Sequence, residues 1–350
     1  MSDDLRAIAS LSQGVLDVRT GPLPLIELLE RETARLQEGH RARRPAAAAL
    51  LRIHAPDESI LADELSLEQA HAAIAAYHRF ASWSDVVARG GDPVDPRFEA
   101  AADAIVAGDA AALRALVAQQ PALVHARSPF RHRATLLHHV AANGVEESRQ
   151  WQSPPNAVEI ARILLDAGAD PDATCPCYGP ADTPLYLLVT SGFPAAAGTQ
   201  ADLVEVLCRA GANPNGREDD GWPFWEAIKF EYAPAAERLA RCGARVDNLV
   251  FAAAVGDLPA VRAYLDDAGR LRPGLDWGAA RAAARELDVD HLLEYALIFA
   301  AAHGRREVVE LLLTQQPDLG VREPFWKATA LEAARWHKRA DIVALLEPLR

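Results

Sequence analysis

The sequence predicts an all-α fold in which pairs of helices stack into a solenoid. Three observations predict it: a signature that ends one helix and opens the next recurs along the second half of the chain, apolar residues recur at helical spacing, and glycine stands where several of the helices would end. Internal repeats carry more weight than single residues, because a helix pair can bury its apolar face only against its neighbours.

The signature has two halves. The first joins the end of a helix to a turn, and it reads ILLDAGADPD at 163–172, VLCRAGANPN at 206–215 and GARVD at 243–247. The second opens the following helix, and it reads TLLH at 135–138 and TPLY at 183–186. Proline suits the first helical turn, where its missing N–H is not needed, and glycine suits the left-handed turn at the end.

These paired segments resemble the ankyrin repeat, a unit of about 33 residues with a β-turn and two helices. The resemblance covers roughly residues 96–350 and includes TLLH at 135–138 with AANG at 141–144, and ALEAA at 330–334. It implies an α-solenoid of stacked helical hairpins with short β-hairpin loops and about six to seven irregular repeats. It also implies that a partner is bound by the hairpin tips and the exposed side of the inner helices.

The predicted array begins with a capping repeat at 96–127, which has no copy of the helix-opening motif. The following helix pairs are 135–144 with 158–167, 183–191 with 202–210, 222–230 with 234–241, 249–255 with 258–268, 292–302 with 307–315, and 329–336 with 340–349. Longer connections interrupt the array at 145–155, 193–200 and 271–290, and residues 278–287 are predicted to form an additional helix.

Residues 1–90 are predicted to form a helical N-terminal extension or cap, after a frayed leader at 1–21. Ser66 followed by Gln69 predicts a capping box that opens a helix ending at Tyr77. The run at 65–83 resembles a helical segment that precedes ankyrin repeats in some bacterial proteins. The GGDP segment at 90–93 is predicted to be the boundary with the solenoid.

Composition argues against several function classes. The formal net charge of −13 disfavours nucleic acid and anionic membrane surfaces as partners. The N-terminus lacks the basic and apolar regions of a signal peptide, and no apolar run approaches the ~20 residues that cross a bilayer. We therefore expect a cytoplasmic protein, and arginine far in excess of lysine favours a GC-rich, bacterial source.

The cysteines are Cys175, Cys177, Cys208 and Cys242. Cys208 and Cys242 take equivalent positions on successive outer helices, and Cys175 and Cys177 lie in a loop. A zinc site needs a second pair of ligands at a suitable spacing, which the sequence lacks. Reduced thiols, no metal and no cofactor are therefore predicted.

Candidate binding residues follow from the layout that the resemblance implies. We predict contacts with another protein at Arg131, His132, Arg133, Asn143, Tyr178, Asp182, Asp219, Asp220, Trp225, Lys229, Phe230, Trp336 and His337. Trp225 stands where the family has histidine, and either core packing or ligand contact accounts for it. His138 stands at the motif histidine, which in the family bonds nearby backbone, so we expect a structural role.

The leading functional prediction is a non-enzymatic scaffold that binds a protein on the concave ankyrin face. The sequence contains no Gly-rich phosphate loop, no Gly-x-Ser-x-Gly and no His-Glu-x-x-His. A second hypothesis is an enzyme or small-molecule binder, in which the long inserts form a pocket with His132, His139, Tyr178, Asp182, Trp225 and Lys229. A third is an immunity or inhibitor protein whose acidic surface attracts a basic target.

Overall fold

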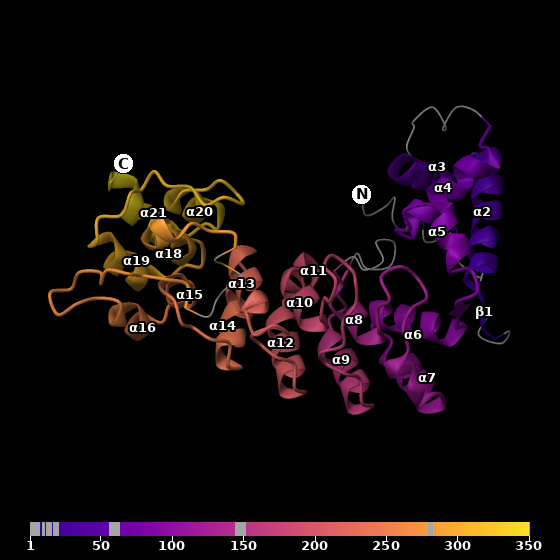
Figure 1. Ribbon diagram of the computed structural model, residues 1–350, viewed down its shortest axis with the longest axis horizontal. Helices are drawn as coiled ribbons and strands as arrows, with labels where there is room; N and C mark the ends of the chain where they lie inside the picture. The colour runs from indigo at the N-terminus through magenta and orange to yellow at the C-terminus, as the bar shows by residue number, and fades with distance from the viewer. Residues whose placement is uncertain are drawn as a thin grey trace. The chain divides into compact units, whose positions relative to one another are not determined.

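The computed structural model describes residues 21–55, 64–143, 152–278, 283 and 285–349, together with Ile8, Leu11 and Leu16. The chain divides into two compact units, residues 1–199 and residues 200–350 (Figure 1). Helical hairpins that stack against one another make up most of the described chain, so the fold is all-α, as the repeats predicted.

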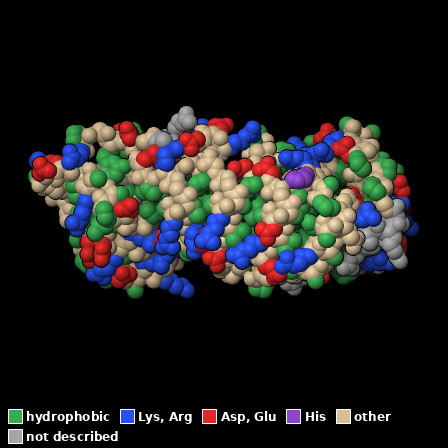
Figure 2. All heavy atoms as spheres, turned by 90° about the horizontal axis from the view of Figure 1, so that it is seen from below, with side chains coloured by type: hydrophobic (Ala, Val, Ile, Leu, Met, Phe, Trp, Pro, Cys, Tyr) green, Lys and Arg blue, Asp and Glu red, His purple; other side chains and the backbone are tan. Residues whose placement is uncertain are grey.

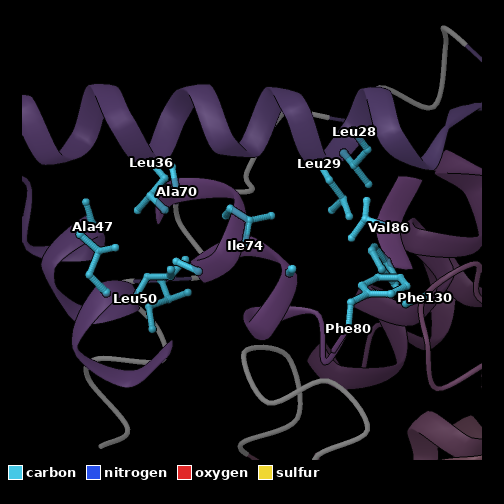
Figure 3. Close-up of a cluster of buried hydrophobic side chains, with 14 of the residues drawn as sticks. Leu28, Leu29, Leu36, Ala47, Leu50, Ala70, Ile74, Phe80, Val86 and Phe130 are labelled. Atoms are coloured by element: carbon cyan, nitrogen blue, oxygen red, sulfur yellow. The ribbon is translucent and has the colours of Figure 1, made fainter. Parts of the chain in front are cut away.

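The first unit begins with helices that pack around one apolar core. These are α2 (Leu25–Arg41), α3 (Pro45–His54), α4 (Leu67–Tyr77) and α5 (Trp83–Ala88). Leu28, Leu29 and Leu36 project from one face of α2 toward side chains of α3, α4 and α5 (Figure 3). Leu28 and Leu29 are adjacent, and Leu36 follows about two helical turns later, so all three lie on one face of the helix and form a single apolar stripe.

Two features tie these helices to the first repeat of the unit. The short strands β1 (Leu23–Pro24) and β2 (Pro93–Val94) pair antiparallel, so the start of α2 lies beside the segment that leads into the repeats. Phe130 belongs to the same apolar core, and its ring stacks on His78 at a centroid distance of 4.6 Å. The N-terminal helices therefore pack on the repeats of their own unit.

The repeats of the first unit are helical hairpins (Figure 1). They comprise α6 (Pro96–Ala107), α7 (Ala110–Gln119), the 3-10 helix η2 (Pro121–His125), α8 (Leu136–Val140), α9 (Ala157–Asp166), α10 (Pro184–Val189) and α11 (Gly192–Ala196). Gly108 connects α6 and α7 in a left-handed conformation with φ of 71°, and a Cβ there would lie 2.4 Å from a side-chain oxygen of Asn156. Glycine is required at this turn for both reasons.

The second unit repeats the same hairpin arrangement. It comprises α12 (Gln200–Arg209), α13 (Trp222–Lys229), α14 (Ala233–Arg241), α15 (Leu249–Val255), α16 (Leu258–Ala263), η3 (Val289–His291), α18 (Leu292–Ala302), α19 (Arg306–Leu313), α20 (Ala330–Trp336), α21 (Ala340–Leu346) and η4 (Glu347–Leu349). Helix α18 packs against both α15 and α20, and all its residues from Tyr295 to Ala302 are buried. A helix buried on every side is expected at the centre of a stack.

Three predicted segments differ from the structure. The inner helix expected at 135–144 is the short helix α8, which has 5 residues and ends at Val140. The insert at 193–200 contains the helix α11. The outer helix expected at 258–268 ends at Ala263, because the Asp266 carboxylate accepts from the backbone N–H groups of Ala268 and Arg270 and folds the chain into a turn.

Other predictions fall outside the described residues. These are most of the leader at 1–21, Gly144 and the insert as far as residue 151, and most of the additional helix expected at 278–287.

Candidate partner-binding surfaces

The loop at 175–182 in the first unit is held closed by its own backbone and one carboxylate. Cys175 and Asp182 exchange both backbone hydrogen bonds, at 2.9 and 2.8 Å. The Asp182 carboxylate accepts from the backbone N–H of Tyr178 at 2.6 Å and of Gly179 at 2.9 Å. Asp182 is buried, so its carboxylate organises the loop and does not face a partner.

His138 fixes this loop to helix α8. Its Nδ1 accepts from the Thr135 backbone N–H at 3.1 Å, so the remaining ring proton is on Nε2 and is donated to the Asp182 carbonyl at 3.2 Å. Burial lowers the pKa of His138 to about 4, which keeps the ring neutral. The structural role expected for His138 is confirmed.

A hollow of about 440 Å³ lies beside the loop, and we call it the loop hollow. It is lined by Arg79, Arg131, His132, Pro176, Cys177, Tyr178 and Gly179. The Arg79 guanidinium lies 5.7 Å from the centre of the Tyr178 ring, a cation–π distance, and Arg131 donates to the Arg79 carbonyl at 3.0 Å. Two guanidinium groups at its wall make the hollow a favourable place for an anionic group.

Asn143 and Tyr178 meet at the edge of the loop. The Tyr178 hydroxyl donates to the Asn143 carbonyl at 2.6 Å, and the Asn143 amide donates to the Leu187 carbonyl at 2.5 Å. The Tyr178 side chain remains 55% exposed. These hydrogen bonds fix an exposed aromatic ring in place, which is how a surface is prepared for binding without a large loss of side-chain entropy.

Arg133 and His132 stabilise the turn that precedes α8. Arg133 has a left-handed backbone with φ of 50°, and its guanidinium pairs with Asp92 at 3.3 Å. His132 is buried, and its Nδ1 accepts from the Ala134 backbone N–H at 3.1 Å. The His132 ring lies 6.0 Å from that of His139, also buried, so both histidines line the interior of the turn.

In the second unit, Lys229 lies at the centre of a charged and aromatic cluster. Its ammonium is 2.8 Å from the Glu226 carboxylate and 3.1 Å from the Glu286 carboxylate. The ring centres of Phe325, Trp222 and Phe230 lie 5.1, 5.8 and 5.8 Å from the same nitrogen. We call these six residues the Lys229 cluster. Burial raises the pKa of Glu226, and the hydrogen bond from Lys229 opposes that shift.

Trp225 is fully buried in the second unit, and its indole N–H donates to Glu286 at 2.5 Å. Its ring packs against Phe251, Phe299 and Phe325. Of the two roles considered for Trp225, core packing is therefore the one that it has, and it is not a surface contact. The reason is that the apolar faces of α15 and α18 meet its side of α13.

Asp219 and Asp220 stabilise the loop before α13. Asp220 is buried and lies 3.4 Å from Arg285, and its other oxygen accepts from the Trp222 backbone N–H at 3.3 Å. Asp219 pairs with Arg245 at 2.6 Å. Both carboxylates have partners within the unit, so neither stands open on the surface as an unpaired charge.

Two tryptophans are the most exposed aromatic side chains of the second unit among its described residues. Trp336 is 81% exposed and Trp326 is 56% exposed. Trp326 is nevertheless fixed: its indole N–H donates to the Lys229 carbonyl at 3.0 Å, and its backbone N–H donates to the buried Glu323 carboxylate at 2.9 Å. Beside Trp336, His337 pairs with Glu231.

Charges of both signs are interspersed with apolar side chains over the face shown in Figure 2. Many are paired within their unit, as Arg322 is with Glu332 and Arg305 with Glu237.

Among the described residues, no group of three or more His, Cys, Asp or Glu side chains could hold a metal ion. In the same part of the chain no helix is long and apolar enough to cross a membrane.

Several contributors to these surfaces were not predicted from the sequence. Arg79 reaches the loop hollow from the end of α4, 99 residues before Tyr178, and Glu286 reaches Lys229 across 57 residues. Phe325 and Glu323 lie in the loop before α20. No local pattern marks these residues, because they are brought to the site by packing of distant segments.

No protein-family model matches the chain, and no curated protein matches its sequence. Among solved structures, the chain is similar to one described as the crystal structure of human ASB11 ankyrin repeat domain. The two are 23% identical, the match covers 71% of this chain and 97% of that chain, and the TM-score is 0.37.

Proposed function

We propose that this protein is a non-enzymatic scaffold that binds another protein through its inner helices and hairpin loops. The observation that carries the proposal is the pair of exposed tryptophans in the second unit, one of which is held by two hydrogen bonds. Tryptophan is enriched among the residues that dominate binding energy, and a side chain fixed before binding loses less entropy on association. A monomer that binds nothing has no need to hold such rings in water.

The proposed binding residues are those predicted from the sequence that the structure leaves accessible, with Trp326 added. In the first unit they are Arg131, Arg133 and Tyr178, with Asn143 supporting the Tyr178 ring. In the second unit they are Asp219, Phe230, Trp326, Trp336 and His337, with Lys229 supporting Trp326 through its carbonyl. Trp225, His132, Asp182 and Asp220 are buried and act through the loops that they hold.

The test compares three forms of the full chain as bait for cellular proteins. They are the unsubstituted chain, Trp326→Ala with Trp336→Ala, and Phe193→Ala as a matched control on another exposed aromatic side chain of the first unit. We expect at least one protein to be captured by the unsubstituted chain and by the control, and to be lost with the tryptophan variant. That protein is then purified, and its affinity for all three forms is measured by calorimetry.

Loss of both tryptophans should weaken binding by at least about 2 kcal/mol, roughly thirtyfold in Kd. A captured protein whose affinity is the same for all three forms would show that the tryptophans are not contacts. If no protein is captured by any form across several growth conditions, the scaffold proposal itself fails.

A further inference from the structure

Two thiols lie in contact in the loop at 175–182 of the first unit. Cys175 and Cys177 are separated by one proline, and their Sγ atoms are 2.8 Å apart. A disulfide bond is about 2.04 Å long, so less than 1 Å of movement separates the pair from bonding distance. Both are free thiols in the structure, and Cys175 is 1% exposed whereas Cys177 is half-buried.

The loop around the pair is rigid on both sides. Cys175 is held by its two backbone hydrogen bonds to Asp182, and Tyr178, directly after Cys177, donates to the Asp182 carboxylate. Proline between the two cysteines fixes one backbone angle of the connection. The sulfur atoms are therefore kept together by the fold and do not meet by chance fluctuation of a loose loop.

The two thiols differ in their access to solvent. Cys177 is half-buried and lines the loop hollow with Arg79 and Arg131, so an oxidant that enters the hollow meets this thiol. Cys175 is buried. Its hydrogen bond with Cys177 is the main cause that raises the pKa of its thiol, and burial is the second. Cys177 is therefore the thiol that an oxidant reaches first, and Cys175 is the thiol that then attacks the mixed disulfide.

We propose that Cys175 and Cys177 form a redox-active dithiol, and that the loop hollow admits an anionic low-molecular-weight disulfide as its oxidant. The Cys177 thiolate attacks one sulfur of the disulfide, forms a mixed disulfide and releases one thiolate. Cys175 loses its proton and attacks the Cys177 sulfur, which releases the second small thiol. Two protein thiols and one disulfide become one protein disulfide and two small thiols, so electrons and protons balance.

The first experiment uses the full chain with Cys208→Ser and Cys242→Ser, which leaves the pair unsubstituted. The chain is equilibrated in buffers of reduced and oxidised glutathione, quenched with acid and analysed by mass. We expect the mass of the chain to fall by two hydrogen atoms and both thiols to be lost to titration, with the link mapped to the peptide that contains 175–177. Two titratable thiols that persist in the most oxidising buffer would overturn the proposal, as would disulfide-linked dimers alone.

Single substitutions in the same background test the order of attack. Cys175→Ser should accumulate the mixed disulfide with glutathione at Cys177. Cys177→Ser should react about tenfold more slowly, since buried thiols in apolar surroundings are unreactive. Equal rates for the two variants would contradict the assigned order. Circular dichroism of both variants checks that each one folds. If one variant does not fold, disulfide formation in the chain with both cysteines still tests the proposal.

Charge selectivity tests the role of the hollow. With Arg131→Gln, the reaction with glutathione disulfide, which is anionic, should slow about three- to fivefold, the effect of one surface charge at close range. The reaction with neutral hydroxyethyl disulfide should be unchanged. Equal slowing with both reagents would mean that Arg131 acts on the fold of the loop and not on the oxidant.

Discussion

Lys229 shows how a single side chain can hold several segments of one unit together. Its ammonium contacts Glu226 on its own helix and Glu286 from a distant segment, and three aromatic rings surround the same nitrogen. The Lys229 and Glu226 side chains are 13% and 4% exposed, so the pair is largely shielded from water. Such a pair is stabilising only while both partners are present, because each buried charge is costly alone.

Lys229→Met should therefore destabilise the protein by about 3 kcal/mol, since it leaves the Glu226 carboxylate buried without its cation. The free energy of unfolding is measured by urea denaturation. Lys229→Met combined with Glu226→Gln should cost less than Lys229→Met alone, because the unpaired charge is removed. The matched control is Lys338→Met, an exposed lysine whose substitution should change stability by less than about 0.5 kcal/mol. Equal stabilities for both lysine variants would refute the account.

At the scale of the helices, much of the stability depends on how each helix begins. Helix α4 starts with a complete capping box: the Gln69 backbone N–H donates to the Ser66 hydroxyl at 3.2 Å, and the Ser66 backbone N–H donates to the Gln69 side chain at 2.9 Å. Helices α8 and α20 begin with the same reciprocal arrangement, at Thr135 and Thr329. Each box supplies partners for N–H groups that have none within the helix.

Ser66→Ala should cost about 1 kcal/mol of stability, the usual effect of losing a side-chain cap. Ser66→Thr keeps the hydroxyl and should lie within a few tenths of a kcal/mol of the unsubstituted chain. Chemical denaturation with far-UV circular dichroism as the readout measures both. Because Ser66 is exposed, the variants change no core packing, and a Ser66→Ala chain as stable as the original would show that the cap contributes nothing.

Each unit contains a buried histidine that makes the free energy of unfolding depend on pH. Burial lowers the pKa of His138 to about 4 and that of His303 to about 3. Both are below the value of about 6.5 in an unfolded chain, so the unfolded state binds protons that the folded state excludes as the pH falls. The stability contributed by the neutral rings is complete above pH ~6.5 and is lost as the pH falls from there toward the folded pKa values.

Between pH 6 and pH 5, each histidine should reduce the free energy of unfolding by about 1 kcal/mol. His303→Gln keeps a donor for the Ile228 carbonyl, which His303 contacts at 3.2 Å, and removes the titration. Its stability, measured by urea denaturation at several pH values, should therefore fall less steeply than that of the unsubstituted chain. Parallel curves for the two proteins would show that His303 does not contribute to the dependence.

At the scale of the whole molecule, the net charge of −13 affects association with a charged partner more than it affects the fold. Many acidic side chains are paired within their own unit, so the excess acts as a diffuse field and not as one strong site. A diffuse field changes the rate of association with a charged partner and is screened by salt over about 8–10 Å under ordinary conditions.

If the partner is a basic protein, as an inhibitor of a basic target requires, the association rate constant should fall about tenfold or more between 50 and 500 mM salt. The dissociation rate constant should change far less, because it reflects the contacts at the tryptophans. Surface plasmon resonance with the captured partner measures both. An association rate that does not depend on salt would exclude steering and with it the basic-target hypothesis.

The sequence determined the stacked helical hairpins, the helix that follows Ser66 and the structural role of His138, because spacing, caps and turn residues act over a few positions. It predicted reduced, unconnected thiols, and only the structure brought Cys175 and Cys177 into contact. The burial of Trp225 was equally beyond local pattern: the sequence left core packing and ligand contact open, and the structure buries the ring. Tertiary packing decided these outcomes, because Arg79, Glu286 and Phe325 approach from segments far along the chain, and no short-range rule specifies which distant side chains will meet.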